Sequence, residues 1–102
     1  MDEQVLELVM YKVKADQIKN FEESKLHQLR DLIKEFEGLI SYETFGEVNE
    51  EGLYVDQVLW RDLGCATRAA EKVKLLENDE PFASIFSVFE EMKFCQHFKK
   101  VA

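Results

Sequence analysis

The chain has 102 residues, enough for one domain but not for two, because each half would be too short to bury a stable core. Hydrophobic residues make up 46% of the chain and charged residues 33%, which is typical of a folded globular protein. The 13 Lys and Arg residues against 21 Asp and Glu residues give a net charge of −8, which argues against binding to nucleic acid or to an anionic membrane. We therefore predict a single domain over residues 1–102 with neither of these partners.

Neither the apolar runs nor the start of the chain indicates export or membrane insertion. The apolar runs are far shorter than the roughly 20 residues that span a bilayer, and Met1-Asp2-Glu3 is acidic where a signal peptide is basic. Cys65 and Cys95 are widely spaced and belong to no CxxC motif, so we expect reduced thiols and no metal finger. These features predict a cytoplasmic protein.

The first third of the chain has the pattern of a strand followed by a long helix. Residues 4–14 are rich in β-branched, aromatic and aliphatic side chains, which favours a largely buried strand. Asp16 is a suitable N-cap, and apolar residues then recur at spacings of mostly three and four as far as Phe36. Gly38 follows as a C-terminal capping glycine. The spacing predicts an amphipathic helix over residues 16–36.

The rest of the chain repeats this alternation of strand and helix. Residues 39–48 and 54–60 have period-two character on either side of a polar break, which predicts a hairpin. Asp62 can cap a second helix, in which Ala66, Ala69, Val73 and other apolar residues recur at helical spacing. A short helix is predicted from Pro81, with Phe82, Ile85, Phe86 and Phe89 along one side, and a last strand over residues 92–101.

This element order, βαββαβ, predicts an α+β ferredoxin-like fold with a four-stranded antiparallel sheet and both helices on one face. Alternation divides the strand residues into two sets, and both sets are apolar enough to need cover. A second copy of the chain is the economical cover for the face without helices, so we expect a homodimer with Phe45, Val58 and Trp60 near the interface. The set expected under the helices is Leu6, Leu8, Met10, Ile40, Tyr42, Val55, Leu59, Met92, Phe94 and Phe98; the set expected on the uncovered face is Val5, Glu7, Val9, Tyr11, Glu43, Phe45, Asp56, Val58, Trp60, Cys95 and His97.

The strand Gly38-Leu39-Ile40-Ser41-Tyr42-Glu43 and the segment Leu59-Trp60-Arg61-Asp62 before an alanine-containing helix carry a resemblance to a known family. Over nearly its whole length, the chain resembles the antibiotic biosynthesis monooxygenase-like family of dimeric α/β-barrel proteins. Members of this superfamily include oxygenases of polycyclic phenols that use no cofactor, haem-degrading enzymes and small-molecule isomerases. The resemblance implies a dimeric α/β barrel and places Trp60 at the family's tryptophan position.

Other residues depart from the family's catalytic patterns. Haem-degrading relatives use an Asn in the first strand and a His in the second helical region, whereas residues 4–14 contain no Asn and residues 62–89 contain no His. The four glycines are isolated along the chain, so they form no phosphate-binding loop. We therefore expect neither haem nor flavin to bind tightly, and we predict no cofactor.

The candidate catalytic residues come from the set expected on the uncovered face of the sheet, which also contains Trp60. His97 shares this set with Glu7 and Asp56, and a carboxylate beside an imidazole in a partly buried site provides a proton acceptor. Two alternatives are a His that is hydrogen-bonded within a dimer interface and a divalent-metal site formed by the His and the two carboxylates. We name His97, Glu7 and Asp56 as candidate catalytic residues, and no residue as a metal ligand.

Aromatic side chains provide the candidate substrate-binding residues. The indole of Trp60 can wall a planar substrate, and Phe82, Phe86 and Tyr42 can complete an apolar pocket, although each also fits an ordinary core position. One hypothesis is a small enzyme that deprotonates an apolar or aromatic substrate without a cofactor. The other is a dimeric module without catalytic activity that binds an apolar ligand or has a purely structural or interaction role.

Overall fold

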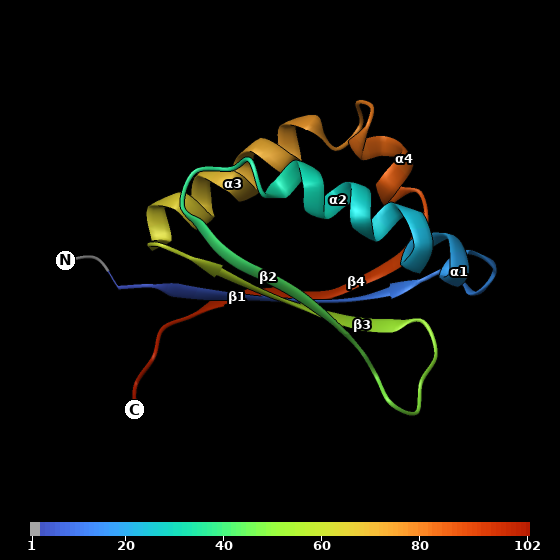
Figure 1. The fold of residues 1–102 in the computed structure, drawn as a ribbon, viewed down its shortest axis with the longest axis horizontal. Helices are drawn as coiled ribbons and strands as arrows, with labels where there is room; N and C mark the ends of the chain where they lie inside the picture. The colour runs from blue at the N-terminus through green and yellow to red at the C-terminus, as the bar shows by residue number, and fades with distance from the viewer. Residues whose placement is uncertain (1–2) are drawn as a thin grey trace.

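The computed structural model describes residues 3–102, which form one sheet with helices on a single face (Figure 1). Figure 1 shows α1 to α4 on the same side of the four strands, while the other side of the sheet carries no helix. The strands are β1 (Val5–Val13), β2 (Leu39–Gly46), β3 (Leu53–Trp60) and β4 (Phe89–Phe98). The helices are α1 (Ile18–Asn20), α2 (Leu26–Ile33), α3 (Leu63–Leu76) and α4 (Phe82–Phe86), with a 3₁₀ turn over Ala15–Gln17 and a π-helical turn over Phe21–Lys25.

The sheet has the order β2-β3-β1-β4, and every pair of neighbouring strands is antiparallel. The first and last strands of the chain thus lie side by side, and β1 is a central strand between β3 and β4. This topology confirms the predicted α+β ferredoxin-like fold. In the register of the sheet, Glu7 pairs with Val58 on one side and with His97 on the other.

The helix predicted over residues 16–36 is present, but it is not uniform. A π-helical turn over Phe21–Lys25 separates α1 from α2, and α2 ends at Ile33. A π turn contains one residue more than an α turn, so it rotates the face of α2 relative to that of α1. Phe21 and Leu29 are both buried on the sheet side of this segment. Gly38 has a left-handed φ of 86°, but it does not cap the helix as predicted, because the helix ends at Ile33 with Lys34 as its C-cap and Gly38 directly precedes β2.

The C-terminal elements differ slightly from their predicted bounds. Asp62 caps α3 as predicted, because its side chain accepts a hydrogen bond from the backbone N–H of Cys65 at 2.8 Å. The last strand covers Phe89–Phe98 rather than residues 92–101. Phe89 matched the helical spacing of the aromatic residues before it, but it pairs with Val13 beyond a register shift in the β1–β4 ladder. Long-range pairing has overridden the local pattern here.

The prediction of which strand residues lie under the helices was wrong for β1, for β3 and for all the assigned residues of β4 except Met92. Tyr11, Asp56, Val58 and Trp60 were expected on the uncovered face, but all four are buried beneath the helices. Of the residues expected near the dimer interface, only Phe45 lies on the uncovered face. Tyr42 and Met92 under the helices and Glu43 and Phe45 on the other face were assigned correctly. Ile40 lies at a register shift in β2 and has no paired residue. The remaining assigned residues lie on the face opposite to the predicted one: Val5, Leu6, Glu7, Leu8, Val9, Met10, Val55, Leu59, Phe94, Cys95, His97 and Phe98.

The buried residues form two clusters between the sheet and the helices. The larger one includes Val58, Trp60, Cys65, Phe82 and Ile85 and joins β3 to α2, α3 and α4. The smaller one is aromatic and includes Tyr11, Phe21 and Tyr54, with Phe89 stacked on Tyr11 at a centroid distance of 4.6 Å. Among residues 3–102, no helix is long and apolar enough to cross a membrane.

Candidate active site

A cavity of about 310 Å³ lies between the helix-covered face of the sheet and the helices above it. Leu29, Ile33 and Val73 line its helical side, and Trp60 and Phe86 contribute aromatic walls. The charged residues that line this largely apolar space are Glu7 on β1, Asp56 on β3, and Lys74 and Glu77 at the end of α3. The structure therefore brings Glu7, Asp56, Tyr42, Trp60 and Phe86, all named from the sequence, to one cavity.

Asp56 is the centre of the first polar group in this cavity. Asp56 is only 4% exposed, and its carboxylate accepts three hydrogen bonds. Tyr11 and Thr44 donate to Oδ1 at 2.8 and 2.7 Å, and Tyr42 donates to Oδ2 at 3.0 Å. A carboxylate has about four acceptor positions, so Oδ2 keeps capacity for a proton donor in the cavity.

Burial and hydrogen bonding shift the pKa of the Asp56 carboxyl group in opposite directions. Removal from water raises its pKa above the ordinary value, whereas the donors Thr44, Tyr11 and Tyr42 and the charge of Arg30 each lower it. The net result is a raised pKa, so the carboxyl group is a stronger proton acceptor than an exposed aspartate. Burial and the adjacent Asp56 also raise the pKa values of Tyr11 and Tyr42, which keeps both hydroxyls protonated as donors.

Glu7 is the centre of the second polar group. Its Oε1 accepts a hydrogen bond from Nε1 of Trp60 at 3.2 Å, and its Oε2 lies 3.2 Å from Nε2 of His97. The thiol of Cys95 donates to the same Oε2 at 3.6 Å. Burial, together with the charge of Glu7 and this hydrogen bond, raises the pKa of Cys95 to about 11. Glu7 thus fixes the indole of Trp60 at the cavity wall.

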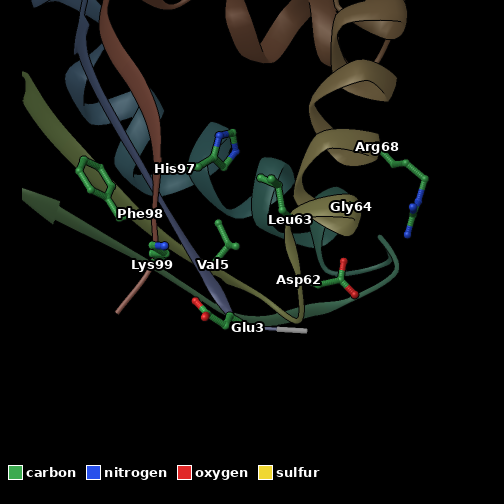
Figure 2. A pocket seen from close by; sticks show the side chains of 9 residues that line it. All are labelled: Glu3, Val5, Asp62, Leu63, Gly64, Arg68, His97, Phe98 and Lys99. Atoms are coloured by element: carbon green, nitrogen blue, oxygen red, sulfur yellow. The ribbon is translucent and has the colours of Figure 1, made fainter. Parts of the chain in front are cut away.

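His97 contacts Glu7 from outside the cavity. Its residue is exposed, and it lines a wider depression of about 790 Å³ near the N-terminus of α3, together with Asp62, Gly64 and Arg68 (Figure 2). Figure 2 shows His97 and Phe98 leaving β4 in opposite directions. The predicted constellation of His97, Glu7 and Asp56 is therefore present as a His97–Glu7 pair and a separate Asp56 group.

The two predicted phenylalanines also lie in different places, one at the cavity and one in the core. Phe86 lines the cavity, whereas Phe82 is buried in the core and stacks on Phe86 at a centroid distance of 5.9 Å. Three partners of the Asp56 group, Tyr11, Thr44 and Arg30, were not predicted from the sequence. These residues come from β1, β2 and α2, so no local sequence pattern connects them. In the described part of the chain, no three His, Cys, Asp or Glu side chains are arranged to hold a metal ion.

The fold and the cavity define a small α+β protein with a ligand-sized site between sheet and helices. No protein-family model matches the sequence, and no curated protein sequence matches it significantly. Solved structures do match the fold. SnoaB, a cofactor-independent oxygenase from Streptomyces nogalater, has a TM-score of 0.78 and 18% identity, over 98% of this chain and 95% of that chain.

Two further structures give the same result. A conserved protein from Methanosarcina mazei Go1 has a TM-score of 0.72 and 16% identity, over 97% of this chain and 94% of that chain. A Bordetella bronchiseptica protein, whose name places it with the antibiotic biosynthesis monooxygenases, has a TM-score of 0.74 and 16% identity, over 99% of this chain and 100% of that chain. The chain therefore has the fold of the antibiotic biosynthesis monooxygenase-like proteins, as its resemblance in sequence implied.

Proposed function

We propose that this protein is a cofactor-independent oxygenase that acts on a small, planar, apolar substrate in the cavity beside Trp60. One observation carries the proposal: a buried carboxyl group with a raised pKa, that of Asp56, faces an apolar cavity with aromatic walls. A general base is most effective when its pKa lies near the working pH, and burial moves Asp56 in that direction. The likeness of the fold to SnoaB supports the same class of reaction.

The proposed reaction needs a substrate with an acidic methylene group next to an aromatic ring system. Asp56 takes a proton from this carbon, and the electron pair left on the carbon forms a bond to O₂. The terminal oxygen of the resulting peroxide then takes the proton from Asp56. Loss of water breaks the O–O bond and the second C–H bond and leaves a ketone. One CH₂ group and one O₂ thus give one C=O group and one water, with O₂ as the only oxidant.

The remaining candidate residues have supporting roles in this proposal. Trp60, Phe86 and Tyr42 hold the substrate plane, and Glu7 fixes the indole of Trp60 through the 3.2 Å hydrogen bond. Phe82 supports Phe86 from the core. His97 does not line the cavity, so it acts on the site through Glu7 and is a positioning residue.

The test is oxygen consumption with anthrone, a planar ketone whose methylene group is acidic. We expect O₂ uptake and quinone formation in a ratio of one to one, and a loss of about 10²- to 10⁴-fold in rate for Asp56→Asn. Asp16→Asn, which removes an exposed carboxylate from the turn after β1, is the matched control. If Asp56→Asn and Asp16→Asn consume oxygen at the same rate, Asp56 is not the base. His97→Ala is expected to lower the rate less than Asp56→Asn.

We also propose that the protein is a homodimer. On the face of the sheet without helices, Phe45 and Phe98 are 47% and 42% exposed, and Leu6 and Leu59, in the same row as Phe98, are partly exposed. Large apolar side chains on a sheet face that no helix covers are typical of an interface. If no C–H acid is ever oxidised, the same dimer with an apolar cavity fits the alternative function, a module that binds a small apolar ligand without catalysis.

A further inference from the structure

Arg30 on α2 lies beside the Asp56 group, although it does not line the cavity. Its Nη2 is 3.5 Å from Oγ1 of Thr44, and that hydroxyl donates to Oδ1 of Asp56 at 2.7 Å. Its guanidinium carbon is also 5.2 Å from the centroid of the Tyr42 ring, a distance typical of a cation–π contact. Arg30 thus contacts two of the three residues that donate hydrogen bonds to Asp56.

The guanidinium group is held in this position at an energetic cost. Its Nε is buried and has no hydrogen-bond partner among residues 3–102. An unsatisfied buried N–H is unfavourable, so the position of Arg30 is not explained by its own hydrogen bonds. A partly desolvated charge interacts more strongly with neighbouring groups than an exposed one does, because less water screens it.

From these contacts we propose that Arg30 and Thr44 are positioning residues for the proposed base: together they orient the carboxylate of Asp56 and stabilise its ionised form. The role of Arg30 in catalysis rests on the proposed function, whereas its action on Asp56 does not. Thr44 accepts from Arg30 and donates to Asp56, so the threonine hydroxyl has one fixed orientation. The guanidinium lies over the Tyr42 ring, and Tyr42 lines the cavity whereas Arg30 does not.

The other groups around Asp56 do not provide a second cation at this position. Tyr11 on β1 and Tyr42 on β2 are neutral hydrogen-bond donors. Glu7 on β1 is a carboxylate, and its charge raises the pKa of Tyr42. On α3, Lys74 lines the same cavity, and Glu77 follows just after the helix as a charge of opposite sign. Arg30 is the cation that lowers the pKa of both Asp56 and Tyr42.

The experiment follows the titration of Asp56 by carboxyl carbon NMR in the ligand-free protein. Arg30→Met removes the charge and keeps most of the length of the side chain, and Thr44→Val removes the hydroxyl with little change in shape. Both are expected to move the Asp56 midpoint to higher pH, because each removes an interaction that favours the ionised form. Arg30→Lys keeps the charge but not the planar fork, so its midpoint should lie between those of the wild type and Arg30→Met. Lys34→Met, which removes a cation just beyond α2 that pairs with Asp31, is the control and should leave the midpoint unchanged.

The activity arm is independent of the NMR arm. In the oxygenase assay, the acid limb of the pH–rate profile for Arg30→Met should move in the same direction as the Asp56 midpoint, with a larger loss of rate at pH 6 than at pH 8. If no protein, including the wild type, oxidises the substrate but the Asp56 midpoints move as expected, the proposed function fails. The action of Arg30 and Thr44 on the Asp56 carboxylate is then still supported. An Asp56 midpoint that is identical in the wild type, Arg30→Met and Thr44→Val would overturn the inference. Should Arg30→Met fail to fold, Arg30→Lys and Thr44→Val decide the question.

Discussion

Trp60 and Glu7 are joined by a hydrogen bond of 3.2 Å from the indole Nε1 to the carboxylate Oε1, across the pairing of β3 with β1. Trp60 is 2% exposed, so its N–H needs a partner inside the protein. Glu7 satisfies this donor and in turn receives Cys95 and His97 on its other oxygen. One carboxylate thereby links the cavity wall to the edge strand β4.

The first prediction concerns the thiol of Cys95. Its pKa of about 11 is raised by burial and by Glu7, so Glu7→Gln should lower the pKa and increase the thiolate fraction at pH 9. Well below the pKa, each unit of decrease raises the thiolate fraction about tenfold. Alkylation by iodoacetamide, with Cys65 replaced by Ala in both proteins, measures this change. Equal rates for Cys95 with and without Glu7 would show that the carboxylate does not act on the thiol.

The second prediction concerns the stability conferred by Asp56 as a function of pH. Because the pKa of Asp56 is higher in the folded protein than in the unfolded chain, its protonation favours folding. This contribution is complete below about pH 4, the ordinary range for Asp, and is lost as the pH rises through the folded-state pKa. The melting temperature of the wild type minus that of Asp56→Asn should therefore fall from pH 3.5 towards pH 8. Asp16→Asn controls for the change in net charge. A difference that rises with pH would mean that the hydrogen bonds outweigh burial.

The third prediction concerns the charge of the ligand. An engineered apolar cavity of about 150 Å³ binds benzene, so a cavity of about 310 Å³ has room for fused rings. Three carboxyl residues (Glu7, Asp56 and Glu77) and one cation (Lys74) line it, so a carboxylate ligand would meet more like than opposite charge in a medium of low dielectric constant. We expect 2-naphthylmethanol and 2-naphthylmethylamine to bind at least about tenfold more tightly than 2-naphthoate.

The single tryptophan gives a direct measurement of this selectivity, because Trp60 lines the cavity. Quenching of its fluorescence and the rise in melting temperature should agree for each of the three compounds. Glu7→Gln should weaken the discrimination against 2-naphthoate. Equal affinities for the acid and the alcohol in the wild type would contradict the electrostatic description of the cavity.

The fourth prediction concerns Gly38, whose φ of 86° is rarely adopted by residues with a side chain. A Cβ at this position would lie 2.6 Å from the Cβ of Cys65, so the backbone before β2 packs directly on the first turn of α3. Gly38→Ala should cost more than about 1 kcal/mol of unfolding free energy from the backbone conformation alone, and the clash adds to this. Denaturant unfolding measures the loss.

Gly64 is the matched control for this substitution. It lies in the first turn of α3, and a Cβ there would meet only the flexible end of Arg68 at 3.1 Å and the side chain of Asp62 at 3.3 Å. Alanine favours the helix relative to glycine, so Gly64→Ala should be nearly neutral or stabilising. Similar losses for the two variants would show that close packing at Gly38 is unimportant.

The fifth prediction concerns the association of two chains. If the face without helices is a dimer interface, light scattering should give about twice the monomer mass of 12.0 kDa at micromolar concentration. Phe45→Lys places a charge on that face, near the end of the edge strand β2, and should shift the equilibrium to monomers. Val48→Lys, at a residue that is 92% exposed, is the control. A wild-type mass of 12.0 kDa would leave the apolar face uncovered and refute the dimer.

The sequence predicted the order of the elements well because each one carries a local signal. Asp62 marks the start of α3 as predicted, whereas Gly38 marks the start of β2 rather than the end of the helix. The prediction of which face of β1 lies under the helices was wrong, because alternation separates the residues of β1 into two sets without showing which set is covered. Glu7 and Asp56 favoured the exposed assignment, since buried carboxyl groups are rare.

The partners that make this burial possible are distant in the sequence. Tyr11 lies 45 positions from Asp56, and Trp60 lies 53 positions from Glu7, so no window of sequence contains either hydrogen-bonded pair. Arg30 could not be found in this way, because its position depends on how α2 lies against β2. Trp60 was identified because a single tryptophan at the end of a strand is conspicuous.

The position of β1 between β3 and β4 has a consequence for synthesis of the protein on the ribosome. One of the two neighbours of β1 is β4, which follows all the other elements in sequence, so this pairing joins residues 5–13 to residues 89–98. A nascent chain that has not released residues 89–98 leaves one edge of β1 unpaired, with the Tyr11–Phe89 stack unformed. Such an edge is a template for pairing with other chains. Folding can therefore be completed only once β4 has left the ribosome, and premature termination before residue 89 would yield an aggregation-prone fragment rather than a smaller stable domain.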